Sequence, residues 1–395
     1  MFASMKFVLA NYGTRGDVEP FVAVGQELQR RGHDVCMAVP NDSLGFVESA
    51  GLAAVAYGLD SQAVEEFRRQ PSKIQNSIGM LTEVIQHVTQ AWAENGTTLM
   101  SLADGADLLL AGYNQQTLAA SVAEYYGIPL AALHIFPTQL LDFGWLHRRI
   151  TKEAEDAQRR ALGLPETPGP ATRSLEIQAY DELCFPGLAA QWAEQGGRRP
   201  FVGALTLESP TDADDEVLSW IGAGTPPIYF GFGSMRVTSP ADTVAMIGAA
   251  CTQLGERALI CSGASDFTEI PHVDHVKVVD TVGVAAVFPA CRAVVHHGGA
   301  GTTAASLRAG IPTLILGLWN EYTIWAAAVE RLKVGSGRQF SETTQEALVA
   351  DLRSIVTPQC VTRAREVATQ MTTPAESLAR TADLLEDAAR QAREG

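Results

Sequence analysis

The sequence has few basic residues for its size. Its 395 residues include 29 Lys and Arg against 45 Asp and Glu, which gives a formal net charge of −16. Binding along a nucleic-acid backbone depends on clustered Lys and Arg that displace counterions from the phosphates. The charge balance therefore argues against nucleic acid as a partner. A small diphosphate remains compatible with it, because a few backbone N–H groups bind one locally whatever the net charge.

Long apolar runs and paired cysteines are also missing. No stretch of about 18 apolar residues is present, so no membrane-spanning helix is expected. The six cysteines lie far apart without a C-x-x-C pair, which favours a reducing, cytoplasmic compartment. The apolar start of the chain lacks a basic segment and runs into a glycine turn, so it is predicted to be a strand rather than a signal peptide.

Two common nucleotide-binding motifs are absent. The chain contains no G-x-x-x-x-G-K-[ST], which argues against a P-loop nucleotidase. The first turn lacks G-x-G-x-x-G, and Pro40 follows the second expected strand where a dinucleotide-binding fold places an acidic ribose ligand. A dinucleotide dehydrogenase is therefore disfavoured.

Short apolar runs alternate with segments of helical spacing throughout the chain. After an apolar run at residues 6–10, Phe21, Val24 and Leu28 recur at helical spacing up to Gly32. This rhythm is typical of βαβ units, and it predicts an α/β protein with two Rossmann-like, parallel-sheet domains facing one another across a cleft. Strands are expected at residues 6–10, 35–39, 108–111, 129–133, 228–232, 258–261, 276–279, 293–296 and 313–316.

A segment rich in Gly, Pro and Arg at residues 186–210 is typical of an interdomain connection. We therefore expect an N-terminal domain at residues 1–200 and a C-terminal domain at residues 201–375. Residues 376–395 form an amphipathic pattern whose polar face mixes acids and bases. This favours a helix packed back on the N-terminal domain over a membrane anchor.

The sharpest motif is the glycine-rich segment from His296 to Thr303, which follows an apolar strand and precedes a helical run. Glycines let the backbone approach a ligand closely, and the free N–H groups of a first helical turn attract phosphate. The segment therefore predicts a diphosphate site that needs no metal. The alternative is a glycine turn that only lets the helix pack tightly on the strand.

A second motif, Gly13 to Pro20, lies at the C-terminal end of the first strand, where ligands of open α/β sheets bind. Asp17 is a candidate general base for an acceptor hydroxyl. The competing interpretation is structural, because an Asp just before Val18, Glu19 and Pro20 makes a good helix cap. The residue pattern alone does not separate the two roles.

Other candidates are weaker. Residues 212–215 resemble a metal-binding D-x-D motif, but they open a short helix, so capping is favoured. His272 and His275 lack matching ligands, and no metal site is predicted there. Aromatic and histidine side chains after another strand fit either an acceptor pocket or core packing. These side chains are His134, Phe136, Phe143 and Trp145.

Three motifs together resemble the actinobacterial branch of the family 1 glycosyltransferases of the B-type fold. They are Gly13 to Phe21, Tyr229 to Ser234 and Val295 to Thr303, and the resemblance covers nearly the whole chain. Residues 174–181 and 312–316 look closest to the mycobacterial glycopeptidolipid glycosyltransferases, and the glycopeptide-antibiotic glycosyltransferases are also similar. Such enzymes serve the cell envelope or secondary metabolism, take nucleotide-sugar donors such as dTDP-deoxyhexoses, and require no metal or other cofactor.

The resemblance implies roles for residues at matching positions. Asp17 matches the catalytic base, with Thr14 beside it, which favours catalysis over capping alone. Val279 to Val282 matches the segment whose backbone meets the donor base. The positions that match the diphosphate site are His296, Gly298, Gly299, Ala300, Gly301, Thr302 and Ser234.

The chain departs from the family pattern at two places. Relatives hold the donor sugar with an Asp-Gln pair before a Trp, whereas this chain has Glu321 and Tyr322 before Trp325. Glu321 still accepts hydrogen bonds, but Tyr322 replaces an amide with a larger phenol, so the choice of sugar is open. The segment at residues 137–145 is shorter than expected where family members build an acceptor loop.

The resemblance implies inverting transfer of a hexose or deoxyhexose from a nucleotide sugar to a hydroxyl of a lipopeptide, glycopeptide or other natural product. Two alternatives stay open: an epimerase or hydrolase of sugar nucleotides on the same fold, and a non-catalytic module that binds a sugar nucleotide. An acceptor attached to lipid would bring the protein to the inner face of the plasma membrane. The oligomeric state is not predicted.

Overall fold

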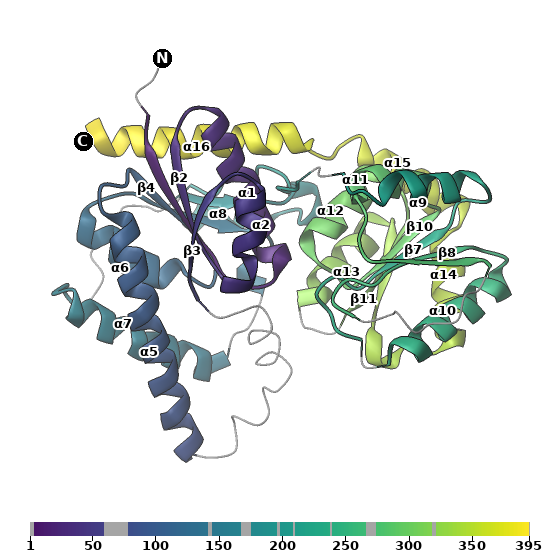
Figure 1. Ribbon diagram of the computed structural model, residues 1–395, viewed down its shortest axis with the longest axis horizontal. Coiled ribbons are helices and arrows are strands. Elements are labelled where there is room, and N and C mark those ends of the chain that lie inside the picture. Colours follow the sequence, from purple (N-terminus) through teal and green to yellow (C-terminus); the bar gives the residue numbers. More distant parts are fainter. Residues whose placement is uncertain are drawn as a thin grey trace. The chain divides into compact units, whose positions relative to one another are not determined.

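The computed structural model describes residues 4–58, 78–140, 144–166, 175–195, 198–207, 210–237, 239–265, 274–317 and 321–394 (Figure 1). They form two compact units. Unit 1 comprises Met1–Glu182, Gly187–Leu207 and Pro374–Gly395, and unit 2 comprises Leu183–Pro186 and Glu208–Thr373. None of the helices in the described ranges is long and apolar enough to cross a membrane.

Unit 1 contains a six-stranded, fully parallel sheet in the order β3-β2-β1-β4-β5-β6. Its strands are β1 (Lys6–Ala10), β2 (Asp34–Val39), β3 (Ala53–Ala56), β4 (Leu108–Gly112), β5 (Leu130–His134) and β6 (Leu175–Gln178). Its helices are α1 (Arg15–Arg30), α2 (Leu44–Ser49), α5 (Ile78–Ala103), α6 (Gln116–Tyr126), α7 (Gly144–Ala161), α8 (Leu188–Gln195) and α16 (Pro374–Glu394).

The central strands of unit 1 are buried on both faces. Phe7 and Leu9 of β1 belong to one apolar cluster, whereas Val8 and Ala10 belong to another. Side chains alternate across a strand, so these two clusters are the cores on the two sides of the sheet. Burial on both sides explains why β1 and β4 consist of continuous apolar residues.

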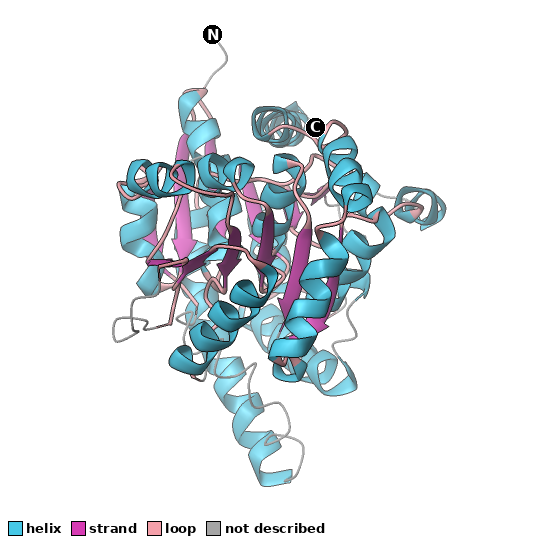
Figure 2. Cartoon of the chain, turned by 90° about the vertical axis from the view of Figure 1, so that its right-hand side faces the viewer, coloured by secondary structure: helices cyan, strands magenta, loops and turns pink. Residues whose placement is uncertain are grey.

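Unit 2 repeats this architecture with the order β12-β11-β10-β7-β8-β9, all parallel, and Figure 2 shows helices on either side of its sheet. Its strands are β7 (Ile228–Gly231), β8 (Ala258–Cys261), β9 (Val276–Val279), β10 (Ala293–His296), β11 (Thr313–Gly317) and β12 (Gly335–Gln339). Its helices are α9 (Asp214–Gly222), α10 (Pro240–Leu254), α11 (Val284–Val287), α12 (Ala300–Ala309), α13 (Glu321–Leu332), α14 (Gln345–Ile355) and α15 (Pro358–Ala368).

Each sheet has a topological switch point. In unit 1 the strand order reverses between β1 and β4, and in unit 2 it reverses between β7 and β10. Loops at the carboxyl ends of such strands form the ligand-binding crevice of an open α/β sheet. The predicted site residues of each unit lie after these strands or their neighbours. The two Rossmann-like, parallel-sheet units expected from the sequence are therefore present.

The connection between the units differs in detail from the expected boundary at residue 200. Arg198 and Phe201 form bridges beside Leu175 and Gln178 of β6, so this stretch extends the sheet of unit 1 as far as Leu207. The short segment Leu183–Pro186 belongs to unit 2 instead, where Phe185 packs edge-on against Trp325 at 5.2 Å between ring centroids.

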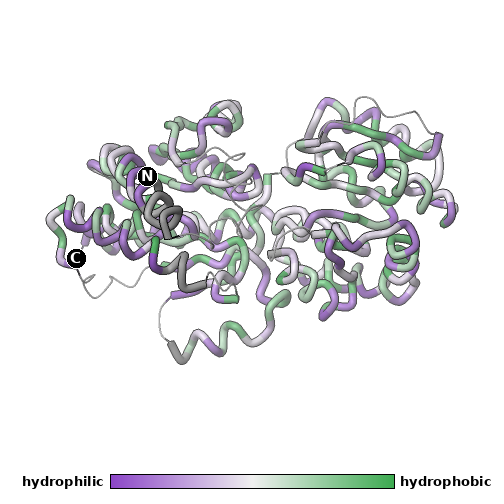
Figure 3. Tube along the Cα trace, turned by 90° about the horizontal axis from the view of Figure 1, so that it is seen from below, coloured by the Kyte–Doolittle hydropathy of each residue, from purple (hydrophilic) through white to green (hydrophobic). Residues whose placement is uncertain are grey.

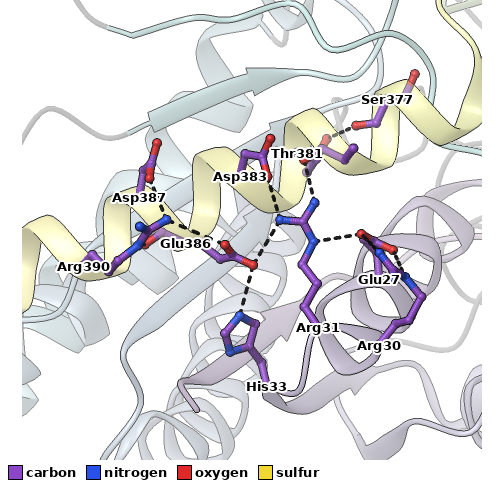
Figure 4. Close-up of polar contacts among 11 residues, drawn as sticks. Glu27, Arg30, Arg31, His33, Ser377, Thr381, Asp383, Glu386, Asp387 and Arg390 are labelled. Carbon is purple, nitrogen blue, oxygen red and sulfur yellow. Dashed lines mark hydrogen bonds and ion pairs between the residues drawn. The ribbon is translucent and has the colours of Figure 1, made fainter. Parts of the chain in front are cut away.

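Helix α16 packs on unit 1 beside α1. Ala382, Leu385 and Ala389 are fully buried in the core that β1 and α1 share. Hydrophilic and hydrophobic stretches alternate along the helical parts of the trace in Figure 3, a pattern typical of helices with one apolar side. At the rim of this contact, Arg31 binds Asp383 at 2.6 Å and Glu386 at 3.1 Å (Figure 4).

Candidate active site

Asp17 lies in the first turn of α1, directly after the loop that follows β1. Its Oδ2 accepts hydrogen bonds from the backbone N–H of Thr14 at 2.8 Å and from the Thr14 hydroxyl at 3.0 Å. Asp17 is only 7% exposed. The N-cap of α1 is Thr14, and not Asp17 as the sequence suggested; Asp17 is the third helical residue and completes a capping box with Thr14. This capping box holds one carboxylate oxygen in a fixed orientation, so it is compatible with catalysis.

Gly13 provides the space for this carboxylate. Its φ is +142°, and a Cβ there would lie 2.7 Å from Cγ of Asp17. A side chain at residue 13 would therefore both strain the backbone and displace the carboxylate. The glycine of the motif is required by the packing of the Asp17 side chain.

Asn11 supports the same turn and was missed in the sequence analysis. Its side-chain N–H donates to the backbone carbonyl of Asp17 at 2.6 Å, and the residue is 4% exposed. A Cβ at Gly112, on the neighbouring strand β4, would collide with the Asn11 amide. The available signal was a polar residue directly after a fully apolar strand, at the sheet edge where ligands bind.

His134 ends β5 and is buried between two polar partners. Its Nε2 lies 3.2 Å from Nε2 of Gln116, and its Nδ1 lies 3.2 Å from the Thr138 hydroxyl. Burial lowers the pKa of His134 to about 4, so the ring is neutral near pH 7. A neutral imidazole with both nitrogens partnered fits a structural role as well as a binding role.

Phe136 packs edge-on against Tyr113, which follows β4, with 5.2 Å between the ring centroids. Since β1, β4 and β5 are neighbours, the structure brings Phe136 and His134 to the same sheet edge as Asp17. Phe143 lies outside the described residues, as does the side chain of Trp145. Only part of the 137–145 segment is therefore open to structural interpretation.

His296 ends β10 and is completely buried. Its Nδ1 accepts a hydrogen bond from the backbone N–H of Gly298 at 3.0 Å. Burial, with a smaller contribution from His297, lowers the pKa of His296 well below its ordinary value, so the ring is neutral. An accepting Nδ1 places the ring proton on Nε2. Among the described residues, Nε2 has no hydrogen-bond partner.

Helix α12 begins directly after the glycine loop with Gly299 as its N-cap. Glycine brings no side chain to cap the first turn, so the N–H groups of Ala300, Gly301 and Thr302 face outward at the positive end of the helix dipole. Thr303 turns inward instead and donates its hydroxyl to the Gly299 carbonyl at 2.8 Å. This arrangement is an open anion site.

His297 connects the glycine loop to the turn after β7. A Cβ at Gly299 would lie 2.7 Å from Nε2 of His297, and one at Gly233 would lie 3.1 Å from its Nδ1. The ring therefore packs closely against both glycines. Burial lowers the pKa of His297 to about 4. Ser234, next to Gly233, is brought to the same edge as the His296 loop.

The predicted base-binding loop follows β9. Val279 accepts a hydrogen bond from Ser262 N–H at 2.8 Å, and the side chain of Val282 is buried with the apolar residues of α9. The side chain of Val282 thus faces the core, so Val282 itself can meet a ligand only through its backbone. Asp280 and Thr281 between them are exposed.

The acidic run at residues 212–215 caps a helix. Asp214 accepts a hydrogen bond from Thr211 N–H at 2.9 Å, and the helix begins at this residue. His275 interacts with the Thr252 hydroxyl at 3.0 Å, while His272 is outside the described residues. Within the described ranges, no group of three or more His, Cys, Asp or Glu is placed to hold a metal ion.

Tyr322 stands beside the glycine loop at the start of α13. Its Cβ would lie 2.9 Å from a Cβ at Gly298, and its ring would collide with a Cβ at Gly317. The ring of Tyr322, which replaces the family's amide, therefore packs on Gly317 at the end of β11, while its Cβ packs on Gly298 of the glycine loop. The side chain of Glu321 lies outside the described part of the chain.

The structure contains two Rossmann-like units, one with a hydrogen-bonded carboxylate and the other with an open anion site. These features define the class of B-type glycosyltransferases. The family model for the Glycosyltransferase family 28 N-terminal domain matches residues 7–138. The model for the Erythromycin biosynthesis protein CIII-like C-terminal domain matches residues 253–384. The first match lies within unit 1, and the second covers unit 2 from the end of α10 onward together with the first half of α16, which belongs to unit 1.

An uncharacterized glycosyltransferase of Mycobacterium tuberculosis is 62% identical over 417 residues, covering 98% of this chain and 100% of the relative. The chain therefore belongs to this glycosyltransferase family, and the expected family and enzyme class are confirmed. Since the alignment is longer than the chain of 395 residues, the relative has segments without a counterpart here. The comparison does not locate them, so the short 137–145 segment stays a prediction.

Solved structures give the same fold at low identity. The calicheamicin glycosyltransferase CalG4 matches with a TM-score of 0.73 and 17% identity, covering 98% of each chain. The glycosyltransferase VinC, solved in complex with dTDP, matches with a TM-score of 0.68 and 19% identity, covering 98% of this chain and all of VinC. The expected B-type fold is thus confirmed.

Proposed function

We propose that this protein transfers a hexose or deoxyhexose, with inversion and without a metal, from a dTDP-linked donor to a hydroxyl of a lipopeptide or other natural-product acceptor. The observation that carries the proposal is the anion site at the start of α12. There an uncapped helix N-terminus adjoins His296, a neutral and fully buried histidine whose Nε2 has no partner among the described residues.

The donor diphosphate binds at this helix end in the proposal. The N–H groups of Ala300 to Thr302 and the helix dipole offset its charge, and Nε2–H of His296 donates to a phosphate oxygen. Ser234 adds a hydroxyl from the turn after β7. The choice of dTDP is supported by two solved structures of the same fold, both of which are complexes with thymidine diphosphate (dTDP).

The acceptor hydroxyl is activated in unit 1. Asp17 takes the proton of the hydroxyl, whose oxygen attacks the anomeric carbon from the side opposite the diphosphate. The new C–O bond forms as the bond to the diphosphate breaks, and the nucleoside diphosphate leaves with the bonding electrons. Thr14 holds Oδ2 of Asp17 through its N–H and its hydroxyl, which fixes the direction of the carboxylate.

The remaining predicted residues take supporting roles. His134 and Phe136 line the acceptor side of the Asp17 edge, the backbone of Val279 to Val282 meets the base, and Glu321 with Tyr322 contacts the sugar. An acceptor of the glycopeptidolipid kind would be presented at the inner face of the plasma membrane. The phenol of Tyr322 offers less hydrogen bonding to a sugar hydroxyl than an amide does, which favours a deoxy sugar.

The test is a screen of donors and acceptors read by mass spectrometry, with Asp17→Asn as the key variant. The amide keeps the size of the carboxylate but does not accept a proton, so transfer should fall by about 10² to 10⁴. Binding of dTDP, measured by calorimetry, should be unchanged because its site is in the other unit.

Asp34→Asn is the matched control, since Asp34 is an exposed carboxylate at the opposite edge of the same sheet. It should transfer at the wild-type rate. Undiminished transfer by Asp17→Asn would show that another group is the base. Donor consumption without any acceptor would indicate a hydrolase or an epimerase, and tight binding without turnover would indicate a non-catalytic module.

A further inference from the structure

Asp214 joins two segments of unit 2 that are far apart in the sequence. Its Oδ1 accepts a hydrogen bond from the backbone N–H of Gly283 at 2.8 Å and from the Thr211 hydroxyl at 2.6 Å. Its Oδ2 accepts from Thr211 N–H at 2.9 Å. Capping of α9 requires only the contacts with Thr211, so the bond to Gly283 is an additional one.

Gly283 closes the loop that follows β9, and this loop is held at both ends. At the first end, Ser262 donates its N–H to Val279 at 2.8 Å. At the second end, the Asp214 carboxylate accepts a hydrogen bond from the N–H of Gly283. The exposed residue Thr281 lies between the two anchors. The backbone around Thr281 is therefore presented in one defined shape.

Apolar packing supports the second anchor. Val282 is buried in the same cluster as Val217 and Ile221 of α9, the helix that Asp214 begins. The loop and the helix thus share a core as well as a hydrogen bond. Because Asp214 is itself 5% exposed, little water competes for the N–H of Gly283.

The carboxylate form is the one that the surroundings stabilise. Burial alone would raise the pKa of Asp214, but the hydrogen bonds from Thr211 and Gly283 outweigh it and hold the pKa below its usual range. A charged acceptor makes a stronger hydrogen bond to a backbone N–H than a neutral amide oxygen does. An asparagine at residue 214 would also place its NH₂ group, which cannot accept a hydrogen bond, against one of the donors from Thr211 and Gly283.

We propose that Asp214 is a positioning residue for the donor nucleotide, which fixes the 280–283 loop in the shape that receives the nucleobase. This inference rests on the proposed function, because it assumes that a nucleoside diphosphate binds beside this loop. It assigns to Asp214 no contact with the reacting atoms. Its effect should fall on recognition of the base and leave the diphosphate site at α12 intact.

The experiment compares thymidine diphosphate with inorganic pyrophosphate, which lacks the base. In the full-length Asp214→Asn variant, calorimetry should show about tenfold weaker binding of thymidine diphosphate, because a charge-assisted hydrogen bond is lost. Affinity for pyrophosphate should match the wild type. The donor KM should rise by a similar factor, with little change in kcat. The matched control is Asp215→Asn, an exposed aspartate in the same helical turn, which should change neither affinity.

Equal loss of affinity for both ligands would overturn the inference, since it would show a general structural defect. Unchanged affinity for thymidine diphosphate would overturn it too. Should Asp214→Asn fail to fold, Thr211→Val provides a second test, because it removes the hydroxyl that donates to the carboxylate. It should weaken the binding of thymidine diphosphate, by a smaller factor, and leave the binding of pyrophosphate unchanged. Wild-type affinity of Thr211→Val for thymidine diphosphate would then reject the inference. A wild-type protein that binds no nucleoside diphosphate would refute the proposed function itself, which is a separate outcome.

Discussion

The two units share one topology but begin their functional helices in opposite ways. Helix α1 follows β1, and its first turn contains Asp17, whose carboxylate accepts from the N-cap residue Thr14 and places a negative charge at this helix end. Helix α12 follows β10, and its N-cap is Gly299, which leaves the first N–H groups uncapped by a side chain. One helix end therefore carries its own anion, and the other is free to bind one.

This difference separates the chemistry of the units. A helix end that already holds a carboxylate repels a phosphate, so unit 1 is suited to a neutral hydroxyl acceptor. An uncapped helix end attracts a diphosphate, so unit 2 is suited to the donor. In the proposed function, two units of the same topology therefore bind different substrates, because one helix begins with a carboxylate and the other has a glycine N-cap.

The buried histidines of the two edges differ in the same sense. His134 in unit 1 has a partner for each ring nitrogen, Gln116 and Thr138. His296 in unit 2 uses Nδ1 within its own loop and has no partner for Nε2 among the described residues. A buried donor without a partner costs free energy, of the order of 1 to 3 kcal/mol, so a ligand that accepts its proton is favoured.

The largest expected effect is on the turn of unit 1 that holds the Asp17 carboxylate. Gly13→Ala forces a side chain against the Asp17 carboxylate at a φ of +142°, so transfer should fall by about 10² to 10⁴, as it would on loss of the base. Initial rates with the acceptor found in the screen measure this loss. Binding of dTDP, which belongs to unit 2, should persist.

Gly16→Ala is its control in the same loop. A Cβ at Gly16 would have only the Thr14 hydroxyl near it, at 3.8 Å, which is an ordinary contact. Its transfer rate should stay near that of the wild type. Similar rates for Gly13→Ala and the wild type would mean that the orientation of the Asp17 carboxylate does not limit catalysis.

The central strands of both sheets were predictable because burial on two faces requires continuous apolar residues. The predicted strands at residues 6–10, 258–261 and 293–296 coincide with the central strands β1, β8 and β10, and the one at residues 276–279 coincides with β9 at a sheet edge. The three strands that were missed, β3, β6 and β12, are all at sheet edges. β12 contains two glycines and no large apolar residue, and pairing with β11 determines its structure.

The site was predictable to the extent that its residues lie within motifs. The His296 loop and the turn at Asp17 are local in sequence, and their glycines identify them. Asp214 binds a partner that only the fold brings near, because Gly283 is 69 residues away. Spacing along the chain contains no signal for such a contact, whereas the hydrogen bonds reveal it.

A smaller effect is expected from changing the packing of Tyr322 on Gly317 in unit 2. Gly317→Ala should lower the free energy of unfolding by about 1 to 3 kcal/mol, because its Cβ collides with the ring of Tyr322. In a Tyr322→Gly background the same change should cost much less, because glycine also removes the Cβ of residue 322, with which the added methyl group would collide too, and Gly317 has no positive φ to strain it. Urea unfolding of the four proteins gives the coupling.

Gly248→Ala is the control for this cycle, because its Cβ would meet only Val276, at 3.6 Å, and alanine favours the helix that contains it. It should leave stability unchanged or raise it. Additive costs for Gly317→Ala and Tyr322→Gly would show that the side chain of Tyr322 does not lie over Gly317.

The smallest effect concerns α16, which packs on unit 1. Arg31 links α1 to Asp383 and Glu386 of α16 and donates to the Ala379 carbonyl at 3.2 Å, with its side chain 19% exposed. Arg31→Gln should therefore lower the stability of unit 1 by about 1 to 2 kcal/mol. Arg30→Gln is the control, since Arg30 is exposed and pairs only within α1 among the interactions described here, so no measurable change is expected. Amide hydrogen exchange of Arg31→Gln measures the protection of the two units separately. An equal loss of protection in unit 1 and unit 2 would mean that the contacts of Arg31 stabilise the whole chain and not unit 1 alone.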